Sequence, residues 1–276
     1  MDTERNAVLA AVAEWPVEVA AVGVTSPSAT LASTGPLDRA LPLASVTKLL
    51  TAMAVLVAVE EETLGLDDPA GPEGSTVAHL LAHASGLGPD GDRLAKVGAK
   101  RIYSNAGFEM LGELLAERSK MPFETYVTEG VLRPLGMTGT TMGHPAYGAA
   151  APAEDLLSLG RELLAPRVLS EATLARATEV AFPGLDGVVP GFGRQDPNDW
   201  GLGFELRDGK DPHWTGSRNS PRTFGHFGKS GTFLWVDPDA ELACACVTNR
   251  EFEAWAVEAW PPLSDQVLAT FAKGQT

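Results

Sequence analysis

The chain has 276 residues, of which 44% are hydrophobic, so it is long enough to bury a substantial core. Its formal net charge of -15 argues against a nucleic-acid partner, because phosphates require a basic surface. The sequence has no run of 18 or more apolar residues, so we expect no membrane-spanning helix. It carries no sign of an oligomeric state.

The N-terminus is expected to form an amphipathic helix rather than a secretory signal. Asp2 and Glu4 accompany a single Arg5, and the apolar stretch that follows ends at Glu14. A signal peptide needs a basic start and an apolar run of about 7–15 residues. We therefore expect a cytoplasmic protein, and the alternative is a secreted one whose signal is missing from this sequence.

Strand patterns at both ends of the chain flank a middle part with helical patterns. Residues 17–24 and 29–32, joined by a turn-like TSPS segment, predict a hairpin. Further strands are expected in 201–208, 231–238 and 241–250, the last two joined by the turn DPDA. Helices are expected at 45–62, 76–84, 105–118, 123–131, 153–164, 170–179 and 252–272.

These elements predict an α+β fold with one antiparallel sheet built from both termini and flanked by helices. The whole chain, 1–276, is expected to form one unit. Its sheet part covers about 1–62 plus 200–276, and an inserted helical part covers about 63–199. Cys244 and Cys246 lie two apart in a strand pattern, so both are expected to be core thiols on one face rather than metal ligands.

The first chemical motif, Ser45-Val46-Thr47-Lys48, opens the apolar helix. Residues three apart on a helix share a face, so Lys48 can reach the Ser45 hydroxyl. A serine needs a neighbour that takes its proton, and burial pushes the pKa of a lysine down toward a usable base. The Ser45 amide at the positive helix end can also stabilise an oxyanion. The plain alternative is a serine that merely caps a helix.

The second motif is Tyr103-Ser104-Asn105, just before a predicted helix. In extended backbone, Tyr103 and Asn105 point to the same side and can face one cleft. A phenol beside a lysine ammonium is expected to favour the phenolate, because opposite charge stabilises it. In the alternative reading, Asn105 caps the helix and Tyr103 packs against it.

The third motif runs from Gly225 to Thr232, with His226, Gly228 and Lys229 inside it. Glycines beside a strand let its backbone approach a ligand, and free amides there can supply a second oxyanion donor. The stretch is also a near miss for a phosphate-binding loop, but a strand pattern follows where such a loop requires a helix.

Taken in order, Ser45-x-x-Lys48, Tyr103-x-Asn105 and His226-x-Gly228 resemble the three motifs of class C β-lactamases, D-alanyl-D-alanine peptidases and related carboxylesterases. The stretches PLASVTKLLTA, VAHLLAHASGL and GHFGKSGTFLWVDP look like that family too, and the likeness covers about residues 40–250. It implies a β-lactamase-like serine hydrolase without a metal or cofactor, which hydrolyses or transfers the acyl group of a small ester, amide or β-lactam-like substrate.

The resemblance also implies a role for each motif residue. Ser45 would be acylated, and Lys48 and Tyr103 would share the proton transfer, with the choice of base left open. Asn105 would bind substrate or order the lysine, and the Ser45 and Lys229 amides would form the oxyanion hole. His226 stands where the family usually has a lysine that attracts a carboxylate.

That departure favours the esterase branch, since histidine is mostly neutral at pH 7. A rival alignment makes Lys229-Ser230-Gly231 the third motif instead. His226 and Lys229 have opposite parity on a regular strand, so only one can face the cleft, and we favour His226. The alternatives are a β-lactamase or D-alanyl-D-alanine carboxypeptidase, and a catalytically silent acyl-binding sensor.

Other candidates are weaker. His79 and His83 lie four apart on a predicted helix, but the H-E-x-x-H pattern of zinc peptidases is not present, so packing is expected. Trp200, Trp214 and Trp235 are expected in the core or a pocket wall. The sequence has no G-x-S-x-G, which disfavours an α/β-hydrolase.

Overall fold

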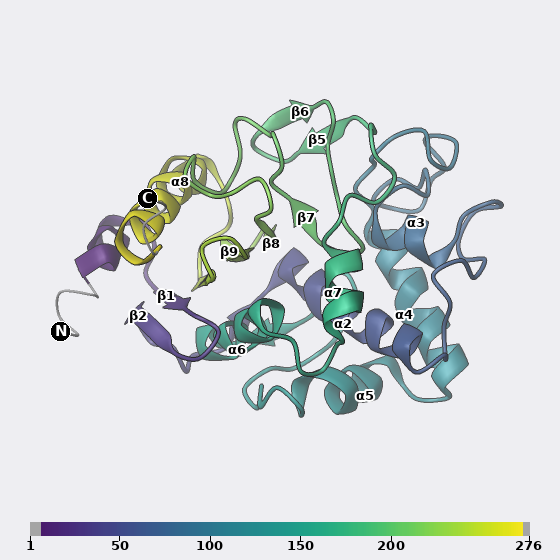
Figure 1. Ribbon diagram of the computed structural model, residues 1–276, viewed down its shortest axis with the longest axis horizontal. Coiled ribbons are helices and arrows are strands. Elements are labelled where there is room, and N and C mark those ends of the chain that lie inside the picture. Colours follow the sequence, from purple (N-terminus) through teal and green to yellow (C-terminus); the bar gives the residue numbers. More distant parts are fainter. Residues whose placement is uncertain (1–6, 273–276) are drawn as a thin grey trace.

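A six-stranded antiparallel sheet forms the centre of the molecule, with strand order β2-β1-β10-β9-β8-β7 (Figure 1). The structure, a computed structural model, describes residues 7–272. The sheet strands are β1 (Ala20–Thr25), β2 (Thr30–Thr34), β7 (Glu205–Leu206), β8 (Phe224–Gly228), β9 (Thr232–Asp237) and β10 (Leu242–Thr248). Two small pairs lie outside it: β3 (Leu41–Pro42) with β4 (Ala150–Ala151), and β5 (Gly187–Val189) with β6 (Gly193–Gln195).

The helical elements fall mostly between the two groups of sheet strands. They are η1 (Ala7–Glu14), η2 (Ala44–Val46), α2 (Thr47–Glu60), α3 (Val77–Leu81), α4 (Asn105–Ser119), α5 (Phe123–Val127), η3 (Thr128–Leu132), α6 (Ala153–Leu164), α7 (Glu171–Ala177) and α8 (Ala254–Phe271). η1 and η2 are 3-10 helices and η3 is a π-helix. The predicted α+β fold class is thereby confirmed.

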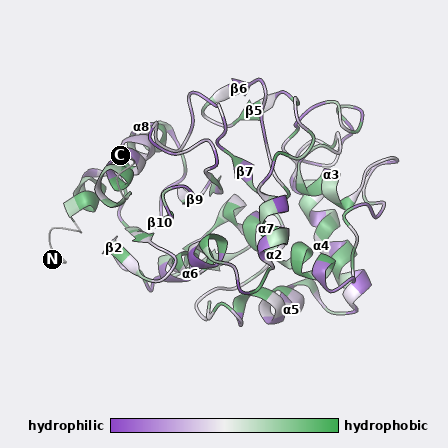
Figure 2. Cartoon of the chain, viewed as in Figure 1, coloured by the Kyte–Doolittle hydropathy of each residue, from purple (hydrophilic) through white to green (hydrophobic). Residues whose placement is uncertain are grey.

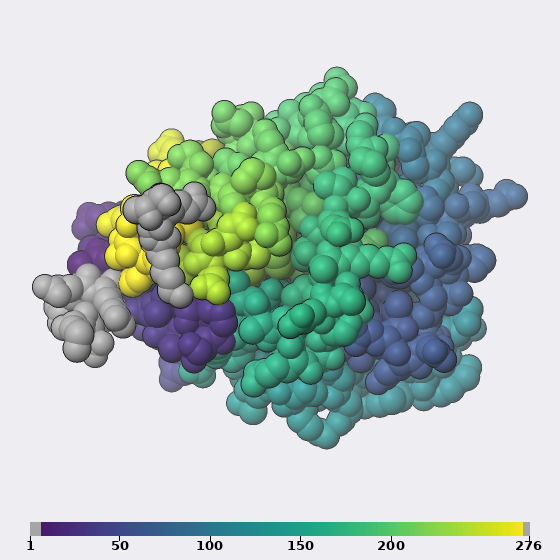
Figure 3. All heavy atoms as spheres, in the orientation of Figure 1, coloured from purple at the N-terminus to yellow at the C-terminus, as the bar shows by residue number. Residues whose placement is uncertain are grey.

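Strands from both ends of the chain meet in the middle of the sheet. β1 pairs antiparallel with β10, so that Val22 lies opposite Cys246. The N-terminal and C-terminal segments adjoin at one end of the molecule (Figure 3). This arrangement confirms the prediction of a sheet assembled from both termini, and the hairpin β1–β2 was expected from the TSPS turn.

The sheet separates two apolar cores, because strand side chains alternate between its faces. On one face, Ala243 and Ala245 pack with Leu156 and Leu157 of α6. On the other face, the core contains Val8, Leu9 and Val12 of η1, Ala256, Trp260 and Leu263 of α8, and the aromatic strand residues Phe233 and Trp235. Cys244 and Cys246 face this second core, and both are buried and free, as expected.

The helix α2 is buried on all sides from Thr47 to Ala58 and is hydrophobic along most of its length (Figure 2). Its predicted burial is confirmed, and it carries the first motif into the interior. Within residues 7–272, no helix has the length and hydropathy that crossing a membrane requires.

Three local expectations were wrong or incomplete. The helix expected from residue 45 begins with the 3-10 turn η2, in which Ala44 has a φ of 45°. Residues 224–228 form a separate strand, β8, which pairs with β7 and β9. The hairpin β5–β6 was not expected at all. The residues of the predicted N-terminal helix before Ala7, including Asp2, Glu4 and Arg5, lie outside the described residues.

Candidate active site

Ser45 lies in the tight turn η2, at the point where the chain enters α2. The end of β8 passes directly beside this turn. A Cβ at Gly228 would lie 2.4 Å from the Leu43 carbonyl oxygen and 3.1 Å from the Ser45 amide nitrogen. The Thr232 hydroxyl donates to the same Leu43 oxygen at 2.9 Å. Glycine at 228 is therefore required for the backbones that carry Ser45 and Lys229 to come together.

Lys48 lies one turn into α2 and is fully buried. Its Nζ donates to Asn105 Oδ1 and to the carbonyl oxygen of Ala146, both at 2.8 Å. The aromatic rings of Tyr103 and Phe108 lie 4.7 Å and 5.5 Å from it. Burial among these uncharged groups lowers the pKa of Lys48 well below its usual range, as the sequence predicted.

Tyr103 reaches the site from the extended segment before α4, and its hydroxyl is hydrogen-bonded to Ser45. The expectation that Tyr103 favours the phenolate was wrong. Burial raises the pKa of the phenol, and the hydrogen bond from Ser45 opposes that shift only in part. The cost of burying a phenolate outweighs any attraction from Lys48, so Tyr103 is a neutral phenol in the folded protein.

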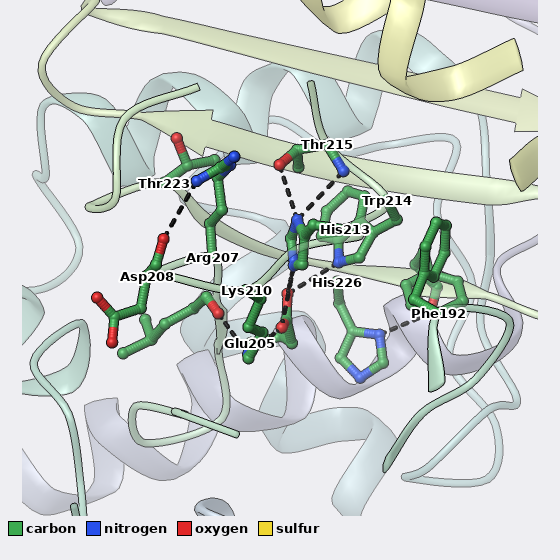
Figure 4. Close-up of polar contacts among 12 residues, drawn as sticks. Phe192, Glu205, Arg207, Asp208, Lys210, His213, Trp214, Thr215, Thr223 and His226 are labelled. Atoms are coloured by element: carbon green, nitrogen blue, oxygen red, sulfur yellow. Dashed lines mark hydrogen bonds and ion pairs between the residues drawn. The ribbon is translucent and has the colours of Figure 1, made fainter. Parts of the chain in front are cut away.

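His226 lies on β8, and its ring centroid is 5.8 Å from that of Tyr103. Figure 4 labels His226 together with Glu205 and His213. The Nδ1 of His226 lies 2.6 Å from the Phe227 carbonyl oxygen, so this nitrogen carries the proton. Nε2 is then an acceptor, and it lies 3.4 Å from the Tyr103 hydroxyl. Burial, together with the charge of Lys48, lowers the pKa of His226 to about 3. The imidazole is therefore neutral.

Asn105 is the first residue of α4, and it is Ser104 that caps this helix. The Ser104 hydroxyl accepts from the Gly107 amide at 3.0 Å, so the alternative reading of Asn105 as a cap does not hold. The Asn105 side chain is instead free to bind Lys48. Ser104 therefore caps the helix, and Asn105 holds the lysine.

Lys229 follows β8 in a turn closed by the Gly231 amide, which donates to the Gly228 carbonyl. Its side chain is 78% exposed, and its Nζ lies 3.6 Å from Glu251 at the rim of the site. β9 begins at Thr232, so a strand follows the Lys229-Ser230 pair, as expected, and not the helix of a phosphate-binding loop. The Lys229 side chain thus lies at the rim, and its backbone directly follows Gly228, which lies beside Ser45.

A cavity of about 270 Å³ opens beside Ser45. Tyr103, His226 and Lys229 line it together with Trp200 and Glu205. Three separate segments of the chain therefore bring the predicted site residues together: Ser45 and Lys48, Tyr103 and Asn105, and His226, Gly228 and Lys229. The arrangement places the Ser45 hydroxyl in a hydrogen bond with the Tyr103 phenol, beside a buried lysine whose pKa is lowered, which suits nucleophilic attack on a carbonyl.

Several residues of the site were not expected from the sequence. His83, expected only to pack, accepts from the Ser104 amide at 3.1 Å, and its ring lies 4.6 Å from that of Tyr103. The His83 ring therefore packs against the Tyr103 ring and helps to hold its position. Ala146 contributes a backbone oxygen, which no side-chain pattern announces.

Metal binding at His79 finds no support in the structure. The His79 ring stacks on Phe182, and its Nδ1 lies 2.9 Å from the Thr76 hydroxyl. Among the described residues, no group of three or more histidine, cysteine, aspartate or glutamate side chains is placed to hold a metal ion. Trp214 and Trp235 are core residues and Trp200 lines the cavity, as predicted.

Comparison with known proteins places the chain in a family. Residues 6–269 match the family model described as Beta-lactamase. The solved structure of a β-lactamase from Mycobacterium bovis is 51% identical, with a TM-score of 0.95 over 96% of this chain and 100% of that one. EstCE1, described as a hydrolase with promiscuous acyltransferase activity, is 18% identical, with a TM-score of 0.77 over 96% and 98% of the two chains, and shares the fold.

Curated relatives match over shorter stretches. The D-alanyl-D-alanine-carboxypeptidase/endopeptidase of Escherichia coli K12 is 28% identical over 143 residues, which cover 38% of this chain and 37% of that protein. The match to this relative thus spans little more than a third of its length. The family match covers nearly all of the sequence and includes the three motifs gathered around Ser45, so this chain belongs to the β-lactamase family and is a serine hydrolase.

Proposed function

We propose that the protein hydrolyses small neutral esters or amides through an acyl-enzyme on Ser45. The observation that carries this proposal is the charge of the site. Neutral His226 stands where a family lysine would attract a carboxylate. The two lysines of the site have other partners, since Lys48 binds Asn105 and Ala146 and Lys229 lies beside Glu251. β-Lactams and D-alanyl peptides both carry a carboxylate that such a site leaves unpaired.

Lys48 is the proposed base. A neutral amine has two N–H donors and one lone pair, and the two donors are satisfied by Asn105 and Ala146. The lone pair is then free to accept the Ser45 proton, directly or through the Tyr103 hydroxyl, which is hydrogen-bonded to Ser45. A lowered pKa keeps this amine unprotonated at a pH where an exposed lysine would be charged.

In the proposed reaction, acylation of Ser45 is followed by hydrolysis of the acyl-enzyme. Ser45 Oγ bonds to the substrate carbonyl carbon while its proton passes to Lys48. The Ser45 and Lys229 amides stabilise the oxyanion. The bond to the leaving oxygen or nitrogen breaks, and that atom takes a proton from the Tyr103 hydroxyl, which is resupplied from Lys48. Lys48, directly or through Tyr103, then takes a proton from a water molecule while the water oxygen bonds to the acyl carbon. The bond from that carbon to Ser45 Oγ breaks, and Oγ takes the proton back, which releases the acid and free Ser45.

A β-lactamase or D,D-carboxypeptidase activity is the second candidate. It is supported by the Mycobacterium bovis structure, described as a β-lactamase, at 51% identity. Such an activity belongs in the cell envelope, so location separates the two candidates. The cytoplasmic location expected from the sequence stays a prediction, which fractionation of native cells tests.

The test compares p-nitrophenyl butyrate, nitrocefin and a D-alanyl-D-alanine peptide as substrates of the wild-type protein and of Ser45→Ala. We expect the highest kcat/KM for the ester and a loss of about 10⁴-fold or more in the variant. A fluorophosphonate should label Ser45 by one adduct in mass spectrometry. Retained esterase activity in Ser45→Ala, or a preference for nitrocefin, would contradict the proposal. A folded protein without any adduct would support the silent acyl-binding alternative.

A further inference from the structure

The cavity beside Ser45 has one apolar side. Besides Tyr103 and Trp200 it is lined by Val188, Val189 and Pro190 of the β5–β6 hairpin, and by Phe227 and Phe252. The Phe227 and Phe252 rings lie 5.0 Å apart and pack on Trp260 in the core. Removing apolar surface from water is the main driving force for binding in such a space. These walls therefore favour an apolar group.

Glu205 is the acidic residue on the cavity wall, yet its charge is cancelled (Figure 4). The buried Lys210 ammonium forms an ion pair with it, and donates further to the Leu206 and Asp199 carbonyl oxygens. The Trp214 indole N–H donates to Glu205 Oε2 at 2.8 Å. The Lys210 ammonium compensates the charge of the Glu205 carboxylate, and both carboxylate oxygens accept hydrogen bonds. The carboxylate is therefore not available to bind a cationic substrate.

The tautomer of His213 completes this cluster. Its Nδ1 accepts from the Thr215 amide at 3.2 Å, so its Nε2 carries the proton and donates to Glu205 at 2.9 Å. Burial lowers the pKa of His213, which keeps this ring neutral. The net charge of the Glu205, Lys210 and His213 side chains is therefore zero, and the cluster gives the cavity a neutral wall.

A second groove of about 510 Å³ adjoins the same hairpin and combines apolar with charged side chains. Lys100, Asp186 and Arg194 are its charged residues, with Arg194 Nη2 3.1 Å and Lys100 Nζ 4.0 Å from the Asp186 carboxylate. Tyr103, Val188 and Pro190 line both spaces. The phenol that protonates the leaving oxygen therefore stands at the border between them.

We propose that these two spaces are separate subsites, the apolar cavity for a neutral acyl group and the groove with charged side chains for the leaving alcohol or amine. The inference rests on the proposed hydrolase function. The orientation follows from the oxyanion donors, because Ser45 and Lys229 line the cavity but not the groove. The Phe252 amide donates to the Lys229 carbonyl at 2.7 Å. This bond holds the aromatic side of the cavity next to Lys229, whose own amide is the proposed oxyanion donor.

The experiment crosses two variants with two ester series. Phe252→Ala alters the acyl cavity, and Arg194→Ala, at a side chain 68% exposed, alters the groove. Leu94→Ala is the control, since this leucine is 63% exposed and lines neither space. One series varies the acyl group from acetyl to hexanoyl and to a hexanoyl-sized acyl ending in a carboxylate. The other keeps hexanoyl and varies the alcohol between apolar and hydroxyl-rich.

In the wild type, we expect hexanoyl to exceed the carboxylate-bearing acyl by at least about tenfold in kcat/KM. Phe252→Ala should lower kcat/KM for hexanoyl about tenfold and for acetyl less than about twofold, whatever the alcohol. Arg194→Ala should change discrimination between alcohols and leave the acyl preference intact. Phe252→Leu should keep most of the hexanoyl preference, so a folding defect in the alanine variant does not decide the result.

Equal effects of Phe252→Ala on acetyl and hexanoyl, or an effect confined to the alcohol series, would overturn the subsite assignment. Titration of Ser45 with a fluorophosphonate separates this failure from that of the proposed function. A labelled, ester-hydrolysing protein without acyl preference contradicts the subsites alone. A protein that hydrolyses no ester contradicts the proposed function as well.

Discussion

Two buried lysines, one bound to Asn105 and one paired with the cavity-lining Glu205, have different chemical consequences. Lys48 lies among carbonyl oxygens and aromatic rings, whereas Lys210 lies against the Glu205 carboxylate. Burial lowers the pKa of both, but at Lys210 the carboxylate opposes the shift. Burial alone raises the pKa of Glu205, and the nearby His213 and Lys210 reverse that effect and lower it to about 2. Lys210 and Glu205 therefore form a charged pair.

The comparison shows that burial by itself does not decide what a lysine does. A buried ammonium next to a carboxylate keeps its proton and serves the structure. A buried amine that donates only to neutral oxygens loses its proton easily and has a lone pair to use. The same residue type thus serves as a structural cation at Lys210 and, in the proposed mechanism, as a base at Lys48.

The largest effect should come from removing the amine that acts as a base. Lys48→Met is expected to lower kcat/KM for a neutral ester by about 10³-fold, within the range of general-base contributions. The unfolding free energy should fall by no more than about 1–3 kcal/mol, because the variant leaves no buried charge but leaves Asn105 Oδ1 and the Ala146 carbonyl oxygen without their donor. Steady-state kinetics and thermal unfolding measure the two effects. Activity within tenfold of wild type would contradict the role of Lys48 as base.

The structural lysine should give the reverse pattern. Lys210→Met leaves the Glu205 carboxylate buried without a counter-charge, so we expect a loss of about 3–5 kcal/mol in unfolding free energy. The matched double variant Lys210→Met with Glu205→Gln removes both charges and should recover part of that loss. Denaturant unfolding measures both proteins. If the single variant is as stable as wild type, the pair is not the charged contact described above.

The pH dependence of kcat/KM distinguishes the protonation states. The base form of Lys48 must be deprotonated, and its pKa is lowered, so activity should rise with pH at values well below the ordinary lysine pKa of about 10.4. The raised pKa of Tyr103 moves any loss from its ionisation above pH 10. His226, with a pKa of about 3, should add no limb near neutrality. A rising limb near pH 10 would show that Lys48 is charged.

The smallest effect is expected at the rim. Lys229→Met removes an exposed ion pair with Glu251, and such pairs contribute little to stability. The thermal midpoint should stay within about 2 °C, and kcat/KM for a neutral ester within about threefold. The backbone amide of Lys229, which is the proposed oxyanion donor, is unchanged. A tenfold or greater loss confined to carboxylate-bearing substrates would favour the rival alignment, in which this side chain binds the carboxylate.

The local parts of the site could be predicted because short-range geometry determines them. The spacing from Ser45 to Lys48 spans one helical turn, and the alternation of extended backbone brings Tyr103 and Asn105 to one side. The central strands of the sheet also lie in apolar runs bounded by turn residues, which predict buried strands. These regularities involve neighbours in sequence, so the sequence alone contains them.

The remainder depends on contacts between distant segments. The Ala146 oxygen accepts a hydrogen bond from Lys48, and the His83 ring packs on Tyr103. Both contacts form only when distant segments fold together, so no pattern of residue types predicts them. The β5–β6 hairpin has short strands without a strong alternating pattern, so the apolar wall around Val188 was not foreseen. The phenolate expectation failed for a related reason, since the degree of burial of Tyr103 is a property of the whole fold.

The pairing of β1 with β10 has a consequence for the timing of activity during synthesis. A ribosome that has translated the first two hundred residues has already made Ser45, Lys48, Tyr103 and Asn105. It has not yet made β8, and β1 has no partner strand other than β2. The nascent chain therefore holds a nucleophile without its second oxyanion donor. In the proposed mechanism, catalysis needs β8 and the strands that pair with it, so we expect no hydrolysis by a chain that stops before residue 224.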